Sequence, residues 1–204
     1  MTLELELDGL ARTLVSRGAR GAAVMVVPVA PGAGASFIAR ALAHRCARLA
    51  DGQVWLYDLD FARNPQSAGA AFSADGYEGS LQGSRFWRCD PDGAGRLALR
   101  RPDGERIFIS RFEREPGSVR RVVFRSSPDY WDKARRACRL AILDAPSGSP
   151  AVTAMARDLE GVVLVGDASS TRRSQAEALA SRVEASGGRV LGVVVNRVDL
   201  KAVS

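Results

Sequence analysis

The feature that most constrains the fold is a short apolar run that passes through a glycine-rich turn into a helical pattern. The stretch VVPVAPGAGASFIARALAHR, residues 26–45, has valines before the turn, Gly32 and Gly34 within it, and small apolar residues at helical spacing after it. A strand that turns this tightly into a helix presents backbone N–H groups at the helix N-terminus, where an anion such as phosphate binds. The sequence therefore predicts a strand, a tight loop and a helix in succession.

Similar apolar runs recur along the chain and alternate with segments of helical character. Near-continuous Val and Leu strands of this kind are typical of a parallel sheet that is covered on both faces. The sequence therefore predicts an α/β fold of three layers, with a mostly parallel sheet between helices. Residues 62–105 are rich in Gly, Ser, Asp and Pro, and their elements cannot be assigned. We expect strands over 22–27, 53–60, 105–112, 120–126, 139–146, 161–168 and 189–198, and helices over 3–17, 36–50, 128–138 and 170–186.

Length and composition favour one domain, which we expect to span residues 1–204, with an N-terminal helix in 1–18 and a divergent insert in 66–130. Three cysteines at irregular spacings and a single histidine support neither a disulfide framework nor a zinc site. No apolar run approaches the roughly 20 residues of a membrane helix, and the first ten residues, MTLELELDGL, do not read as a secretory signal. We therefore expect a cytoplasmic protein without a transmembrane segment.

The basic residues are almost all arginine, since Lys133 and Lys201 are the only lysines. Residues 85–139 hold 15 Arg and Lys against 8 Asp and Glu, whereas the whole chain has a net charge of +6. Such a segment is either a solvated arginine-rich face or a docking surface for something acidic, such as a protein segment, anionic lipid or nucleic acid. Composition alone leaves both interpretations open.

Ligands of parallel α/β sheets bind where the strands end, so the residues that follow each strand are the candidates for a site. Gly32 and Gly34 would let backbone N–H groups approach a phosphate, and the Ser36 hydroxyl would bind phosphate or magnesium. Asp58, Asp60 and Asp144, which follow two other strands, would hold the metal ion or its water ligands. The alternative is that the glycines only make a tight turn and that the aspartates cap helices.

A second interpretation of the same loop is half of a dinucleotide-binding fingerprint. Gly32 and Gly34 form a G-x-G pair, and Asp58, which ends the next strand, would bind a ribose hydroxyl. Phe37 replaces the third small residue of that fingerprint. This interpretation also leaves the motifs around Asp144 and Asn196 unexplained.

Taken together, the strand-end motifs resemble those of the cytoplasmic domain of bacterial tyrosine kinases of capsule and exopolysaccharide export, within the MinD/ParA group of deviant P-loop ATPases. The loop APGAGAS resembles the family's Ala-Pro-Gly-x-Gly-Lys-Ser/Thr motif. The segment DLDFARNP resembles Asp-x-Asp-x-Arg-x-Pro with one inserted residue, and LDAP resembles the apolar strand that ends in Asp-x-Pro. The resemblance extends from about residue 24 to 198 and is weakest over 66–130.

The resemblance implies a P-loop NTPase-like fold and a site for ATP or ADP with Mg²⁺. The nucleotide-binding positions that it implies are Gly32, Ala33, Gly34, Ala35, Ser36, Phe37 and Asn196, where Asn196 matches an asparagine near the base. The metal-binding positions that it implies are Ser36, Asp58, Asp60 and Asp144.

The departures from the family pattern point to lost chemistry. Ala35 stands where the family has its loop lysine, and Ala30 stands where the wider group has a second lysine. The loop lysine neutralises charge on the transferred phosphoryl group, so its absence removes a large part of catalysis. No tyrosine follows Tyr130, so the family's tyrosine-rich tail is missing, and the N-terminal segment lacks the Glu-x-x-Arg-x-x-Arg pattern of ring assembly.

The sequence therefore predicts a non-catalytic relative, a pseudo-kinase or pseudo-ATPase, that acts by binding. Its expected partner is a transmembrane polysaccharide co-polymerase, which would hold it at the inner membrane through a surface that includes Arg120 and Arg121. A weakly active ATPase or kinase is one alternative, and a ParA-like DNA-associated protein is another. The acidic residues among the arginines and the lack of a recognition-helix pattern argue against nucleic acid. Homo-oligomerisation stays open.

Overall fold

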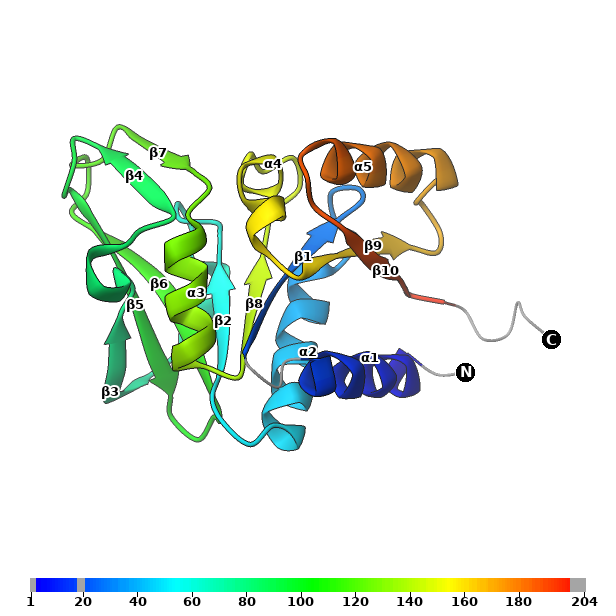
Figure 1. Cartoon of the computed structure of the whole chain (residues 1–204), viewed down its shortest axis with the longest axis horizontal. Helices are drawn as coiled ribbons and strands as arrows, with labels where there is room; N and C mark the ends of the chain where they lie inside the picture. Colours follow the sequence, from blue (N-terminus) through cyan, green and yellow to red (C-terminus); the bar gives the residue numbers. More distant parts are fainter. Residues whose placement is uncertain (1–2, 18–20, 199–204) are drawn as a thin grey trace.

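The computed structural model describes residues 3–17 and 21–198 (Figure 1). The helices are α1 (Leu3–Arg17), α2 (Ala35–Leu49), α3 (Pro128–Ala137), α4 (Ala151–Met155) and α5 (Arg173–Ala185). The strands are β1 (Ala22–Pro28), β2 (Val54–Asp58), β3 (Phe72–Glu78), β4 (Trp87–Asp90), β5 (Gly95–Pro102), β6 (Ile107–Arg114), β7 (Arg121–Phe124), β8 (Leu140–Asp144), β9 (Gly161–Asp167) and β10 (Val190–Asn196).

An eight-stranded sheet runs through the molecule in the order β10–β9–β1–β8–β2–β6–β5–β3. The strands from β10 to β6 are parallel, and β5 and β3 continue the sheet as antiparallel strands. The predicted mostly parallel sheet is thus confirmed. Because β8 lies between β1 and β2, the order differs from that of dinucleotide-binding folds, in which the first and second strands are neighbours. The dinucleotide interpretation is therefore wrong.

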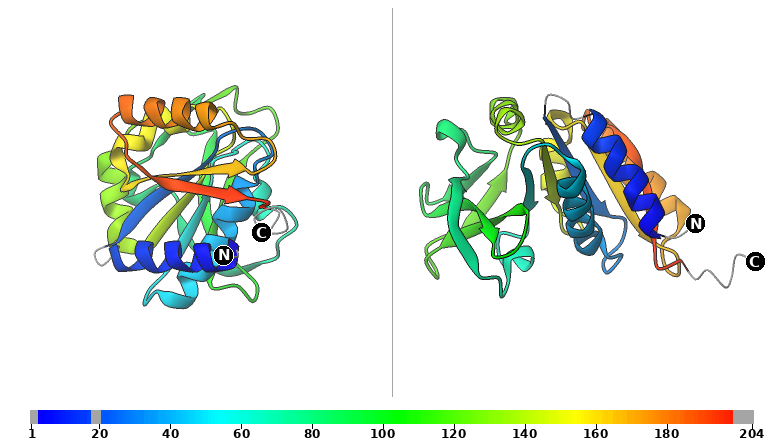
Figure 2. Two further views of the ribbon diagram at one scale, coloured as in Figure 1. Left: turned by 90° about the vertical axis from the view of Figure 1, so that its right-hand side faces the viewer. Right: turned by 90° about the horizontal axis from the view of Figure 1, so that it is seen from below.

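Helices cover both faces of the sheet (Figure 2). The parallel strands are buried on both sides, and their residues alternate between two apolar cores. On β1, for example, Val24 and Val26 pack toward α1 and α2, whereas Met25 packs toward the opposite face, which α3, α4 and α5 cover. This arrangement is the predicted three-layer architecture.

The unassigned stretch 62–105 forms β3, β4 and β5, and the strand predicted at 120–126 is β7. β7 does not join the main sheet but pairs with β4 in an antiparallel two-stranded ribbon. A cluster of aromatic rings fills the space between this ribbon, α3 and the main sheet. Of the aromatic residues in the basic segment 85–139, the following are buried in this core: Trp87, Phe108, Phe112, Tyr130 and Trp131.

The N-terminal helix packs on α2 through Leu7, Ala11 and Leu14. Residues 1–2 and 18 of the predicted N-terminal segment lie outside the described residues. Within the described part of the chain, none of the helices has both the length and the apolar character needed to cross a bilayer.

Candidate functional site

The glycine loop, residues 30–36, connects β1 to α2 at the carboxyl edge of the parallel strands. Gly32 and Gly34 have φ angles of 80° and 86°, which side chains other than hydrogen strongly disfavour. A Cβ atom at Gly34 would lie 2.3 Å from Nδ2 of Asn196 at the end of β10. The same Nδ2 donates a hydrogen bond of 3.1 Å to the carbonyl of Ala33. Glycine at position 34 therefore permits both the turn and its close packing on β10.

The first turn of α2 presents its backbone N–H groups at this loop. An α-helix leaves the N–H groups of its first residues without intrahelical partners. Among the described residues, no side chain caps α2, and its first turn contains no acidic residue. Ser36 and Phe37 are exposed in this turn, with 65% of Phe37 accessible, whereas Ala35 is buried. The helix N-terminus thus retains the amide groups that bind an anion.

Two buried aspartates lie beside the loop, on adjacent strands. Asp58 ends β2 and Asp144 ends β8, and the two residues are directly paired in the register of the sheet. Asp58 is 1% exposed and Asp144 is 3% exposed. Both oxygens of Asp58 accept backbone N–H groups, one from Asp60 at 3.0 Å and the other from Gln66 at 2.7 Å. Asp60 lies nearer the surface, where its own Oδ1 accepts the N–H of Arg63.

Gln66 lies at the centre of this group. Its side-chain Nε2 donates hydrogen bonds to Oδ2 of Asp144 at 2.7 Å and to the carbonyl of Ser36 at 2.9 Å. Its backbone N–H holds Asp58, and only 5% of the residue is exposed. The side-chain amide of Gln66 therefore joins Asp144 to the Ser36 carbonyl, and its backbone N–H adds Asp58 to the same group.

The loop that carries Gln66 is fixed by contacts from distant parts of the chain. Asn64, in the left-handed region at φ 48°, exchanges side-chain hydrogen bonds with both the N–H and the carbonyl of Phe112 on β6. Arg40 of α2 donates to the carbonyl of Gln66 at 2.7 Å and to Glu105 at 2.6 Å. These contacts hold Gln66 over the strand ends.

Burial dominates the electrostatics of the two aspartates. It raises the pKa of Asp58 to about 7, although the N–H groups of Gln66 and Asp60 oppose the shift. It also raises the pKa of Asp144, against the stabilising contacts from Gln66 and Ser36. In addition, Oδ1 of Asp144 is buried without a hydrogen-bond partner among the described residues. No positive charge on the described residues therefore offsets the cost of ionising Asp58 and Asp144.

The strands β9 and β10 end in a third acidic group. Oδ1 of Asp167 accepts hydrogen bonds from the N–H and hydroxyl of Ser169, and Oδ2 accepts one from Arg197 at 2.7 Å. These contacts lower the pKa of Asp167 to about 2. The neighbouring Asn196 accepts the N–H of Arg197 and donates to Ala33, so its amide is already engaged within the protein.

No lysine approaches the glycine loop within the described part of the chain. Lys133 lies on α3, where it bonds Asp129 and Ser84, and Lys201 is outside the described residues. Arg40, the nearest arginine on α2, is engaged by Gln66 and Glu105. In the described ranges, neither lysine nor Arg40 replaces the charge of the missing loop lysine.

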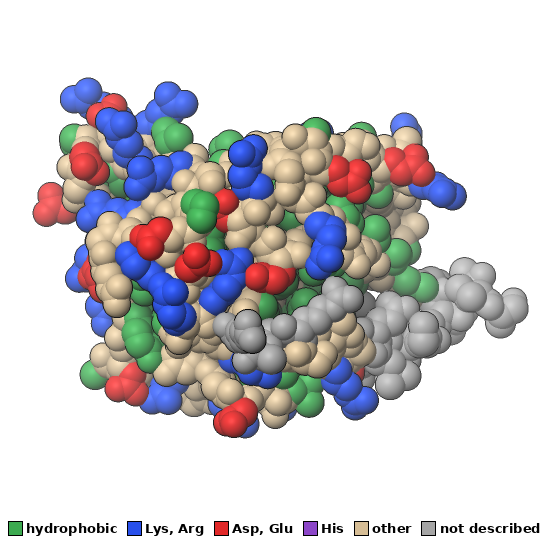
Figure 3. All heavy atoms as spheres, viewed as in Figure 1, with side chains coloured by type: hydrophobic (Ala, Val, Ile, Leu, Met, Phe, Trp, Pro, Cys, Tyr) green, Lys and Arg blue, Asp and Glu red, His purple; other side chains and the backbone are tan. Residues whose placement is uncertain are grey.

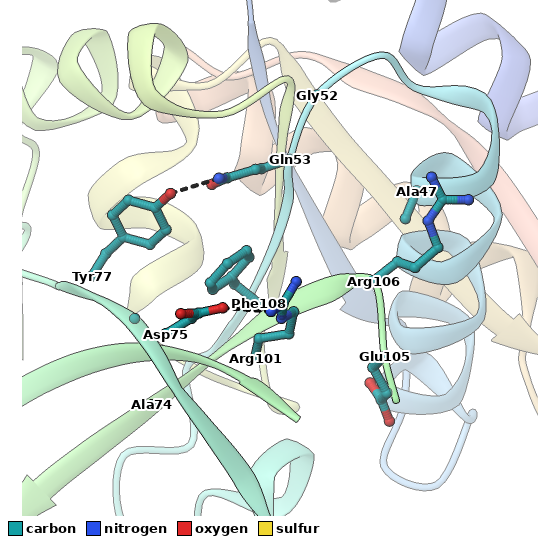
Figure 4. Close-up of a pocket in the computed structure, with 11 residues that line it drawn as sticks. Ala47, Gly52, Gln53, Ala74, Asp75, Tyr77, Arg101, Glu105, Arg106 and Phe108 are labelled. Atoms are coloured by element: carbon teal, nitrogen blue, oxygen red, sulfur yellow. Dashed lines mark hydrogen bonds and ion pairs between the residues drawn. The ribbon is translucent and has the colours of Figure 1, made fainter. Parts of the chain in front are cut away.

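A separate groove lies away from these residues (Figure 4). This groove of about 620 Å³ is lined by residues that precede β2 and β6, including Gln53 and Arg106, and by Asp75, Tyr77 and Arg101 from β3 and β5. The Gln53 amide donates to the Tyr77 hydroxyl at 2.6 Å, and Asp75 faces Arg101. The groove is thus at the opposite edge of the sheet from the glycine loop, and it does not contain the predicted site residues.

The structure brings together the glycine loop, Ser36, Asp58, Asp144 and Asn196, as the strand-end argument predicted. Gln66 was missed, because it follows Pro65 in a region without periodicity. The available signal was its position directly after the DLDFARNP motif.

Comparison with known proteins supports the fold. The sequence matches no protein-family model and no curated protein. The structure is similar to the BceF tyrosine kinase domain, with a TM-score of 0.64 and 17% identity over 93% of this chain and 75% of that one. It is also similar to the kinase domain of the Escherichia coli tyrosine kinase ETK, with a TM-score of 0.60 and 17% identity over 91% and 71% of the two chains.

Two nucleotide-related proteins share the fold as well. A ParA-family ATPase from Chlorobium tepidum gives a TM-score of 0.57 at 14% identity over 89% of this chain and 76% of that one. A nucleotide-binding protein from Archaeoglobus fulgidus in complex with ADP gives 0.50 at 16% identity over 90% and 70%. The chain therefore has the P-loop NTPase-like fold of bacterial tyrosine kinase domains and ParA-family ATPases, as the motifs predicted.

Proposed function

We propose that this protein is a non-catalytic relative of the exopolysaccharide tyrosine kinases, a pseudo-kinase or pseudo-ATPase that acts by binding a membrane polysaccharide co-polymerase. The observation that carries the proposal is the position of Gln66. Its amide donates to Asp144 and Ser36 while its backbone N–H satisfies Asp58. Both carboxylate oxygens of Asp58 and one of Asp144, which would face Mg²⁺, are thus engaged by the protein itself.

The residues of the site fit a bound phosphate better than a metal ion. Uncapped amides at the start of α2 and two glycines with positive φ form a surface that an anion can approach. A magnesium ion needs oxygen ligands that face an open position, whereas the side chain of Gln66 presents N–H donors there. With Ala35 in place of the lysine, a phosphate would be held by backbone dipoles alone.

A protein that does not catalyse a reaction acts by binding partners through its surface. Arg120 and Arg121 lie exposed at the start of β7, and we assign them to the surface that the co-polymerase approaches. Such a partner would place the protein at the cytoplasmic side of the inner membrane. The prediction that follows is a loss of co-polymerase capture in the double variant Arg120→Glu/Arg121→Glu, with no loss of fold.

Isothermal titration with ATP and ADP, with and without Mg²⁺, tests the state of the site. The proposal predicts weak binding that Mg²⁺ does not strengthen. Ala35→Lys should strengthen nucleotide binding, since Phe37 is exposed and does not fill the loop. Strong Mg²⁺-dependent binding by the wild type would contradict the proposal.

A weakly active, Mg²⁺-dependent ATPase is the second candidate, and one observation favours it. Oδ1 of Asp144 is buried without a partner among the described residues, and burial raises the pKa of the adjacent Asp58 to about 7. Both features would be relieved by a cation that displaced the side chain of Gln66. Turnover that requires Mg²⁺ and disappears in Asp144→Asn would establish this candidate instead.

A further inference from the structure

The two-stranded ribbon of β4 and β7 carries an unusual concentration of unpaired positive charge. Residues alternate along both strands, so Trp87, Cys89, Val122 and Phe124 face the core. The opposite face is exposed, and we call it the ribbon face. It consists of Arg88 and Asp90 on β4, Arg121 and Val123 on β7, and the flanking Arg120 and Arg125.

Several arginines elsewhere in the basic segment form ion pairs within the protein. Arg96 and Arg100 pair with Glu113, Arg101 pairs with Asp75, and Arg135 pairs with Glu160. Among the ion pairs of the described residues, by contrast, none involves the arginines of the ribbon face. Figure 3 shows basic side chains gathered at this end of the molecule, over β4 and β7. The ribbon face therefore presents four exposed arginines, Arg88, Arg120, Arg121 and Arg125, that form no ion pair among the described residues.

An aliphatic side chain lies among these charges. Val123 is 42% exposed and is directly opposite Arg88 in the ribbon, with Arg121 and Arg125 two residues away on the same strand face. Guanidinium groups bind phosphate through paired hydrogen bonds, and an exposed aliphatic residue between them can enter the boundary between headgroups and acyl chains. The ribbon also lies at one end of the molecule, at the upper left of Figure 1.

We propose that the ribbon face binds the anionic phospholipid headgroups of a bilayer. This proposal deepens the proposed function and rests on it only for the presence of a membrane nearby. Lipid contact would align the protein beside its membrane-embedded partner, and the weak lipid binding would add to the protein contact.

Sedimentation with phospholipid vesicles tests the proposal. The full chain should bind vesicles of equal parts phosphatidylglycerol and phosphatidylcholine, and it should not bind phosphatidylcholine alone. Binding should weaken as NaCl rises from about 0.1 M to about 0.5 M, because salt screens exposed charges. Arg120→Glu/Arg121→Glu should lower the partition coefficient by about tenfold or more, since each basic residue near an anionic surface contributes about 1 kcal/mol.

A matched control variant separates the effect of the ribbon face on vesicle binding from the effect of the protein's net charge. Arg173→Glu/Arg182→Glu makes the same change of charge on the exposed face of α5 and should lower binding by less than about threefold. Both double variants should melt close to the wild type, because exposed substitutions usually change stability by less than about 0.5 kcal/mol.

Several outcomes would overturn the proposal. They are failure of the wild type to bind anionic vesicles, equal loss of binding in the two double variants, and tighter saturable binding to duplex DNA or to a polyglutamate peptide than to vesicles. The vesicles contain no co-polymerase and no nucleotide, and co-polymerase capture by the same variant is measured in detergent without phospholipid, so each of these results leaves the proposed function to its own tests. Conversely, ATP turnover would contradict the pseudo-enzyme without affecting the lipid result.

Discussion

Replacing Gln66 by alanine should destabilise the protein and open its strand-end site to Mg²⁺. The variant removes the 2.7 Å hydrogen bond to Asp144 and the 2.9 Å hydrogen bond to the Ser36 carbonyl. It keeps the backbone bonds of residue 66 to Asp58 and Arg40. The change therefore isolates the side-chain amide.

The size of the effect follows from burial. Asp144 is 3% exposed and one of its oxygens already has no partner among the described residues, so the lost donor is not replaced easily. A buried polar group left without its partner costs about 1–3 kcal/mol, and the Ser36 carbonyl adds part of a second such loss. We expect a total of about 2–4 kcal/mol. In a chain of this size, that corresponds to a fall in melting temperature of about 5–15 °C.

Thermal unfolding with and without MgCl₂ measures both effects. At a concentration of about one hundred times its Kd, Mg²⁺ should raise the free energy of unfolding of Gln66→Ala by about 2.7 kcal/mol. It should leave the free energy of unfolding of the wild type unchanged. Gln66→Met retains a similar volume and removes the donors without adding charge, so it separates the lost hydrogen bonds from the cavity. The reasoning is refuted if Gln66→Ala is as stable as the wild type, or if Mg²⁺ stabilises the two proteins equally.

Further predictions concern the charge and the packing of the same site. Because the pKa values of Asp144 and Asp58 are raised on folding, both contribute stability at low pH that is lost as pH rises above about 4, through about 7 in the case of Asp58. In urea titrations, Asp144→Asn should therefore become more stable relative to the wild type across that range, and a difference independent of pH would contradict the assignment. Gly34→Ala should cost about 2 kcal/mol or more, from its positive φ and its contact with Asn196. Asn196→Ala should remove the contact but not the backbone strain, so the double variant should lose less than the sum of the two single losses; strict additivity would contradict the contact.

The parallel part of the fold could be predicted because its signals are local. The run AAVMVV and the amphipathic helix after the glycines specify β1 and α2 without knowledge of the rest of the chain. β3, with the sequence FSADGYE, could not be assigned, because an antiparallel edge strand that is largely exposed lacks a continuous apolar run. The five-residue helix α4 is too short to show a period.

Part of the candidate site could likewise be predicted from the sequence, and part could not. The proximity of Asp58, Asp144 and the glycine loop follows from the rule that parallel strands end at one edge, and the structure agrees. The role of Gln66 depends on the path of a loop that is set by Asn64 on Phe112 and by Arg40. Those contacts join residues far apart in the sequence, so no local pattern reveals them.

Release of phosphate from ATP tests the central claim most directly. Purified wild-type protein should show no Mg²⁺-dependent turnover above a boiled sample, because Ala35 replaces the loop lysine and Gln66 engages Asp144 and Ser36. Asp144→Asn, measured in parallel, should be indistinguishable from the wild type. Sustained hydrolysis by the wild type that is abolished in Asp144→Asn would show that Asp144 has a catalytic role, and the protein would then be an active enzyme.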